Sequence, residues 1–181
     1  MAERERSDAR RNRERLLETA ACAFAKGDVS LEAIARGAGV GIGTLYRHFP
    51  TREALIEAVY RAELAEVSAS AAELLAAHPP AEALRRWMDR YAEFVRAKRG
   101  MAESLRSVFD SGKVEPSETR ASIVGAVSAL LDAGASDGVL RSDVRADDVV
   151  TSLLGIFLAS GSREQSGRML DLLVDGLVAT R

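Results

Sequence analysis

Apolar residues recur along the chain at intervals of three and four, and no stretch keeps the apolar and polar alternation of a half-buried strand. Alanine, leucine, arginine and glutamate dominate these periodic stretches, and all four residues favour helices. The pattern therefore predicts an all-α protein. We expect helices over about 7–25, 31–37, 43–49, 51–77, 81–97, 101–110, 117–135, 146–160 and 163–179.

The predicted helix over residues 51–77 is much longer than those before it. At a rise of about 1.5 Å per residue it would reach about 40 Å, and Pro79 and Pro80 stop it from continuing. A helix of this length suits a connector between two domains. We therefore expect one domain over residues 1–52 and a second over 53–181, with 51–77 as the connector.

The stretch GVGIGTLYRHFPTRE, residues 39–53, interrupts the helical pattern. A short amphipathic segment precedes it, and Ser30 is suited to cap that segment. Two short helices joined by a tight turn form a helix-turn-helix, whose second helix enters the DNA major groove while the first supports it. Gly39 stands where such a turn needs a positive φ angle, and Gly41 and Gly43 would let the second helix approach DNA closely.

The residues that follow the turn have side chains that can bond to DNA. Hydroxyl, guanidinium and imidazole groups bond to phosphates and base edges. Thr51 would present the positive end of the next helix to a phosphate. The candidate contacts from this chemistry are Thr44, Tyr46, Arg47, His48, Thr51 and Arg52.

Charge is unevenly distributed along the 181 residues. The net charge is −2, but residues 1–52 hold ten Lys and Arg against seven Asp and Glu, while the remainder is acidic. Such asymmetry indicates that the front of the chain meets an anion. Arg10, Arg11 and Arg13 either contact phosphates or belong to a solvated helix face, and the sequence leaves both interpretations open.

The run SLEAIARGAGVGIGTLYRHFPTREALIEAVY, residues 30–60, resembles the DNA-binding domain of TetR-family transcriptional regulators. The shared elements are Ile-Ala-x-x-Ala-Gly-Val and then Gly-Thr-Leu-Tyr-x-x-Phe, followed by a hydroxyl and a basic residue. The resemblance implies a three-helix DNA-binding domain and a C-terminal helical domain that binds a small-molecule effector and dimerises through its last two helices. It also adds Ile42 and Gly43 to the expected DNA contacts.

Aromatic and methionine side chains concentrate in two adjacent predicted helices of the second domain. Hydrophobic core is the simpler interpretation for each residue, but a cavity bounded by such side chains would suit an apolar or aromatic effector. The candidate pocket residues are Trp87, Met88, Tyr91, Phe94, Met101, Leu105 and Phe109.

The last two predicted helices are more apolar than burial of a single face requires. A two-fold interface between copies of the chain would account for the surplus, and the alternative is the core of one subunit. The candidate interface residues are Leu153, Ile156, Phe157, Met169, Leu173 and Leu177.

Several classes of protein and site are not indicated. A single cysteine, Cys22, excludes an intramolecular disulfide, and we expect it to be a small buried residue of the first helix. The two histidines stand thirty positions apart, so we expect no metal site and no cofactor. No secretory signal or membrane-spanning run is evident, which predicts a cytoplasmic protein. Residues 80–181 show no group of acidic and basic side chains that could act together in catalysis, so we do not expect the protein to be an enzyme.

The sequence thus predicts a ligand-responsive transcriptional repressor. Its expected partners are a palindromic double-stranded DNA operator, a small-molecule effector and a second copy of the chain. The alternative is a constitutive DNA-binding or architectural protein without an effector.

Overall fold

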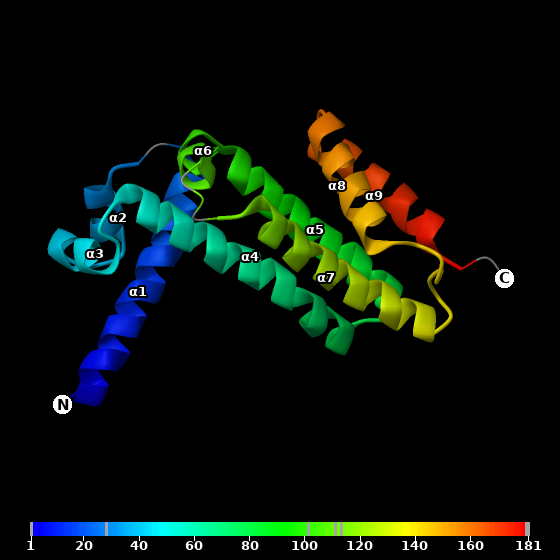
Figure 1. The fold of residues 1–181 in the computed structure, drawn as a ribbon, viewed down its shortest axis with the longest axis horizontal. Coiled ribbons are helices and arrows are strands. Elements are labelled where there is room, and N and C mark those ends of the chain that lie inside the picture. The colour runs from blue at the N-terminus through cyan, green and yellow to red at the C-terminus, as the bar shows by residue number, and fades with distance from the viewer. Residues whose placement is uncertain (1, 28, 101, 111, 113, 180–181) are drawn as a thin grey trace. The chain divides into compact units, whose positions relative to one another are not determined.

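The computed structural model describes residues 2–27, 29–100, 102–110, 112 and 114–179, and within these ranges it is helical with no strand (Figure 1). One isolated bridge pairs Leu140 with Val178. The all-α prediction is confirmed. In chain order the helices are α1 (Ala2–Phe24), α2 (Leu31–Gly37), α3 (Ile42–His48), α4 (Arg52–Ala77), α5 (Pro80–Gly100), α6 (Ala102–Asp110), α7 (Pro116–Ser136), α8 (Ala146–Ala159) and α9 (Arg163–Leu177).

The chain divides into two compact units, and neither is continuous in sequence. The first comprises residues 1–63 and 96–115, and the second comprises residues 64–95 and 116–181. This division differs from the boundary expected after residue 52, because the end of α5 and all of α6 join the N-terminal helices. Each of α4 and α5 contributes to both units.

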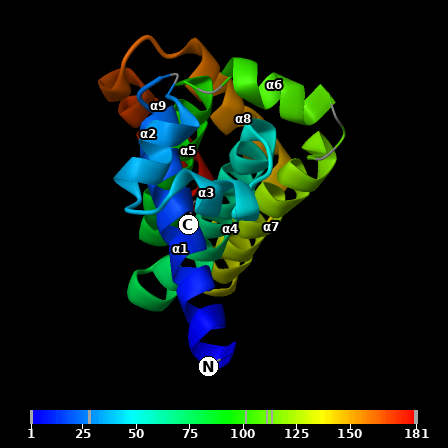
Figure 2. The same cartoon turned by 90° about the vertical axis from the view of Figure 1, so that its left-hand side faces the viewer.

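The N-terminal helices of the first unit bury apolar side chains, and Figure 2 shows how the ribbons of α1, α2 and α3 are arranged. Each helix places its apolar residues on one face at intervals of three or four, which is the period of an amphipathic helix. Gly37 lets α1 approach α2, because a Cβ atom there would lie 3.0 Å from the Thr19 methyl group. The buried residues include Leu16, Ala20, Phe24, Leu31, Ile34, Ala35, Ala38, Leu45, Phe49, Leu55, Ile56, Val59 and Tyr60.

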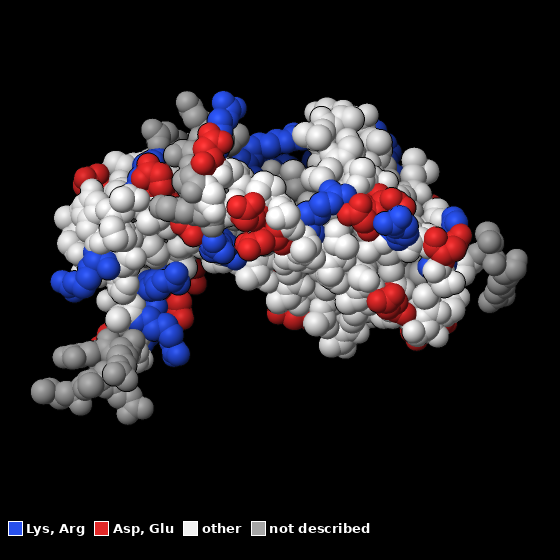
Figure 3. All heavy atoms as spheres, viewed as in Figure 1, with Lys and Arg blue, Asp and Glu red and all other residues white. Residues whose placement is uncertain are grey.

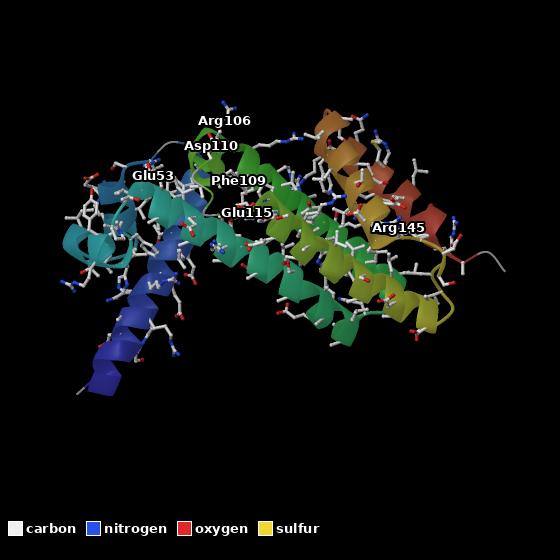
Figure 4. The ribbon with its side chains drawn as sticks, in the orientation of Figure 1. Glu53, Arg106, Phe109, Asp110, Glu115 and Arg145 are labelled. Carbon is white, nitrogen blue, oxygen red and sulfur yellow. The ribbon has the colours of Figure 1, made fainter. Side chains whose placement is uncertain are left out.

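The helix α6 belongs to this unit through an aromatic contact with α4. The ring of Phe109, marked on α6 in Figure 4, meets the ring of Tyr60 edge to face with 5.5 Å between centroids. The ammonium group of Lys98 lies 5.5 Å from the centroid of the same tyrosine and pairs with the carboxylate of Glu63. These contacts join segments that are about 35 to 50 residues apart in sequence.

The second unit is built from the end of α4 and from α5, α7 and α8, with α9 beside α8 (Figure 1). The indole N–H of the fully buried Trp87 donates to the carbonyl oxygen of Val67 at 2.9 Å, which satisfies the only polar atom of that side chain. The guanidinium group of Arg85 on α5 donates to the Asp171 carboxylate on α9 at 2.6 Å. Apolar packing and these polar contacts together hold the helices of the unit.

One expectation about the first helix is wrong. Cys22 is exposed rather than buried. The buried face of α1 runs through Leu16, Ala20 and Phe24, which are four residues apart, and Cys22 lies off that line.

Candidate nucleic-acid interface

The helix α3 is held in place by two buried side chains, Leu45 and Phe49, which are 0% and 3% exposed. The backbone N–H of Phe49 donates to the Leu45 carbonyl at 2.8 Å and closes the helix. In the preceding turn Gly39 has φ +67°, which L side chains rarely adopt. The positive φ angle expected at this glycine is confirmed.

The rest of α3 forms one exposed face. Because successive helical residues advance by about 100° around the axis, Gly43 and Arg47 lie at the centre of the face opposite Leu45 and Phe49. Both are exposed. Ile42 and Tyr46, 37% and 45% exposed, flank this centre on one side, and the half-buried Thr44 and His48 flank it on the other. The structure therefore brings together the six α3 residues that the sequence predicts at the interface.

The glycines at the start of α3 have no packing reason within the chain. A Cβ atom added to Gly41 or Gly43 would meet no atom within 4 Å. Glycine weakens a helix relative to alanine, so its presence at Gly43 calls for a reason outside the chain. Without side chains at these two positions, another molecule can approach the backbone at the N-terminal end of α3, and this is such a reason.

Thr51 and Arg52 lie at the start of α4 and have different surroundings. The hydroxyl of the exposed Thr51 accepts from the N–H of Ala54 at 3.1 Å, as an N-cap residue does. The half-buried Arg52 donates to the carbonyl oxygen of Val29 at 2.7 Å, and its guanidinium lies over the ring of Phe24. Arg52 is thus engaged inside the unit, whereas Thr51 remains on its surface.

Arginines of α1 supply positive charge near α3. Arg10 pairs with Glu14 at 3.8 Å and Arg11 with Asp8 at 3.5 Å, both in exposed positions, so the charge of each arginine is partly balanced. The Arg13 guanidinium lies 5.5 Å from the centroid of Phe49 at the end of α3. Figure 3 shows Lys and Arg side chains around α1 and α3 on the visible face, with Asp and Glu side chains among them.

The residues predicted to line an effector pocket fall in both compact units. In the second unit, Tyr91 stacks on Trp87 at 5.3 Å and on Phe94 at 6.1 Å, and it meets Phe157 of α8 edge to face at 5.7 Å. The fully buried Met88 belongs to the same core. The predicted residues Leu105 and Phe109 belong to the first unit, and Met101 lies outside the described residues.

The residues predicted for a dimer interface are mostly inside the subunit. Leu153, Ile156, Phe157 and Leu177 are at most 8% exposed within a single chain. They belong to the hydrophobic core of the single chain, and their place in a dimer interface stays a prediction. Met169 and Leu173 are half-buried.

Two large apolar side chains that the sequence analysis missed lie on the surface of α8 and α9. Leu158 is 76% exposed and Leu172 is 71% exposed. Each lies on the side of its helix away from the buried residues, together with the exposed Gly155 and Gly176. An apolar residue that falls outside the buried stripe of an amphipathic helix is the signal that would have revealed them.

Other kinds of site are not apparent in the described part of the chain. Its His, Cys, Asp and Glu side chains do not gather in a group of three or more that could hold a metal ion. Among the same residues, no helix combines the length and the apolar character needed to cross a membrane.

Comparison with known proteins identifies the family. The sequence profile of bacterial regulatory proteins of the tetR family matches residues 16–59, and that of the C-terminal domain of SbtR-like transcriptional regulators matches residues 79–179. No curated protein is similar enough to count as a match. The two profiles cover both the helix-turn-helix and most of the C-terminal helices.

Solved structures extend this similarity over almost the whole chain. A TetR transcriptional regulator from Streptomyces coelicolor is 49% identical with a TM-score of 0.85, and the alignment covers 93% of this chain and 99% of that one. A TetR transcription regulatory protein from Mycobacterium vanbaalenii is 32% identical with a TM-score of 0.78, over 96% and 99% of the two chains. A transcriptional regulator from Cytophaga hutchinsonii shares the fold at 17% identity, with a TM-score of 0.70 over 92% and 98%.

The fold, the exposed face of α3 and these similarities agree with one another. A helix-turn-helix at the N-terminus is followed by a helical C-terminal region in this chain and in its relatives. The protein therefore belongs to the TetR family of DNA-binding transcriptional regulators.

Proposed function

We propose that this regulator is a ligand-responsive repressor that binds a palindromic operator as a homodimer. The observation that carries the proposal is the exposed face of α3, which centres on Gly43 and Arg47 and rests on the buried Leu45 and Phe49. An arginine fork at the centre of a recognition helix can bond both acceptors of a guanine edge, while the neighbouring hydroxyls bond phosphates.

A homodimer is supported by the exposed leucines of α8 and α9. Isolated exposed apolar residues are common on protein surfaces, but Leu158 and Leu172 lie on adjacent helices beside glycines that permit close approach. A two-fold interface would bury the same residues on both subunits. It would also pair two recognition helices, which read half-sites about one helical turn of DNA apart.

An aromatic or apolar effector is supported by the stacked side chains of the second unit. Trp87, Tyr91 and Phe94 follow one another along α5, and Phe94 is half-buried at the end of the stack. An effector bound beside this stack would shift the protein between a DNA-binding state and a state with wrongly spaced recognition helices. The size of the shift is limited by the difference in its affinity for the two states.

The test is an electrophoretic mobility shift of the purified full chain on DNA from directly upstream of its own gene, beside scrambled DNA of equal length. Ionic strength is held constant because phosphate contacts dominate affinity and depend on salt. We expect tight, selective binding with two chains per site. Insertion of about five base pairs between the half-sites should abolish binding, because it turns one half-site to the opposite side of the helix.

A constitutive architectural protein would give a different result. Such a protein would bind both DNA fragments equally and would tolerate the insertion. Its DNA affinity would also be unaffected by every compound in an effector screen. Selective binding that no compound alters would support a repressor without a ligand.

A further inference from the structure

A groove of about 440 Å³ lies between α1, the end of α3 and the first turns of α4, entirely within the first unit. Arg13 stands on the α1 side, and His48 and Phe49 stand at the α3 end. The volume is within the range of small-molecule sites. None of the α4 residues that line this groove belongs to the expected DNA-contacting set.

The α4 side of the groove has a small apolar stripe with a charged pair beside it. Ala54, Ala58 and Ala62 are spaced four residues apart and so lie on one side of the helix. Their short side chains leave the space that forms the groove. Glu57 and Arg61 line the same groove, and the Arg61 Nε donates to a Glu57 carboxylate oxygen at 3.0 Å.

Positive side chains outnumber negative ones among the residues that line the groove. These are the guanidinium groups of Arg13 and Arg61 and one carboxylate, that of Glu57, which pairs with Arg61. The Arg13 guanidinium is positioned over the Phe49 ring, and the His48 imidazole adds a further hydrogen-bonding group. An oxyanion is the complementary ligand, since arginine binds carboxylates and phosphates through two parallel hydrogen bonds.

We infer that this groove binds a small organic anion, a carboxylate or a phosphate ester, whose apolar part rests along Ala54, Ala58 and Ala62. The anion would occupy Arg13 and His48, which lie beside the DNA-facing side of α3. Binding of the anion and binding of DNA therefore oppose each other, and each weakens the other by the same factor. The opposition between anion binding and DNA binding rests on the proposed operator binding, whereas binding of the anion itself does not.

The first experiment is an isothermal titration of the full chain with phenyl phosphate, beside the neutral analogue benzyl alcohol. Arg61→Gln removes a cation from the groove, and Ala58→Leu fills the space beside it. Arg86→Gln is the matched control, because Arg86 also pairs with a glutamate four positions earlier, at 2.8 Å, but lies outside the groove. Circular dichroism confirms that each variant is folded.

We expect saturable binding of phenyl phosphate, at least tenfold weaker binding in Arg61→Gln and in Ala58→Leu, and unchanged binding in Arg86→Gln. Benzyl alcohol should not bind measurably. The inference is overturned if the unaltered protein shows no saturable binding. It is equally overturned if Arg86→Gln weakens binding as much as Arg61→Gln, because the effect would then be one of general surface charge.

The second experiment repeats the mobility shift with phenyl phosphate, against sodium chloride at equal ionic strength. Phenyl phosphate should release operator DNA from the unaltered protein but not from the Arg61→Gln variant. Without phenyl phosphate, the DNA affinity of Arg61→Gln should differ from that of the unaltered protein by less than twofold. Retention of DNA by the anion-bound protein would overturn the antagonism. A loss of DNA affinity in Arg61→Gln without anion binding would make the groove a DNA-backbone site. If no DNA binds selectively, the proposed function fails, and the titration still decides whether the groove is an anion site.

Discussion

The guanidinium of Arg52 lies 5.2 Å from the centroid of the Phe24 ring, and so it joins the first turn of α4 to the last turn of α1. The same group donates to the carbonyl oxygen of Val29 in the loop that follows α1. The contact of Arg52 with DNA stays a prediction. Its contacts within the chain show that it also holds together the helices that carry α3.

Replacement of Arg52 by alanine should lower the free energy of unfolding by about 2 kcal/mol. This figure combines a cation–π contact with a hydrogen bond from a charged donor. Urea unfolding followed by circular dichroism measures the change. Arg47→Ala is the control, since exposed Arg47 should alter stability by less than about 0.5 kcal/mol. Equal stability of the two variants would contradict the structural role of Arg52.

Replacement of Arg47 by alanine should reduce operator affinity by about 1–3 kcal/mol, as expected for loss of an arginine that reads a base edge. The helical content and the oligomeric state should stay unchanged, because the side chain is exposed at the centre of the α3 face. Mobility shifts at fixed salt measure the loss. Undiminished selective binding by this variant would show that α3 is not the reading element.

Alanine at Gly39 and at Gly43 should have opposite effects on stability. Gly39→Ala places a side chain at φ +67° and should cost about 1–2 kcal/mol. Gly43→Ala adds a methyl group in open space within a helix and should stabilise the protein by up to about 1 kcal/mol.

Only Gly43→Ala should weaken DNA binding while the protein becomes more stable, because its methyl group stands between the helix and the groove of the DNA. Urea unfolding and mobility shifts of the two variants give both quantities. Full operator affinity in Gly43→Ala would mean that close approach to the backbone is not required at this position.

Replacement of Leu172 by glutamate should weaken the proposed dimer at least tenfold without unfolding the subunit, because the side chain is 71% exposed in the single chain. Val139→Glu is the matched control, since Val139 is also exposed but lies outside α8 and α9. Sedimentation equilibrium measures both. A Leu172→Glu variant that remains fully dimeric would place the interface elsewhere.

Replacement of Leu153 by alanine should act on the subunit itself. This fully buried side chain belongs to the core of the second unit, so its truncation should lower the free energy of unfolding by about 2–5 kcal/mol. Urea unfolding at protein concentrations that differ tenfold separates this loss from any change in association. A variant as stable as the unaltered protein would show that Leu153 does not pack as the structure indicates.

The sequence by itself was sufficient for the order of the helices and for the helix-turn-helix. Both depend on local features: apolar residues three and four apart, the Ser30 cap whose oxygen accepts from Ala33 N–H, and the glycine at the turn. The expected helix boundaries agree with the structure to within a few residues, apart from the earlier start of α1 at Ala2. Local rules act over about one helical turn, which is why they could be recognised without tertiary contacts.

Only the tertiary structure decided how these helices use their side chains. Leu153 and Leu158 are equally apolar and lie in the same helix, but α7 and α9 cover only the side that carries Leu153. Arg52 turns inward because Phe24, distant in sequence, lies beneath it, and α6 joins the N-terminal unit through the contact of Phe109 with Tyr60. Which side chains are buried or paired depends on which distant segments of the chain pack together. The periodicity along one helix does not show which segments these are.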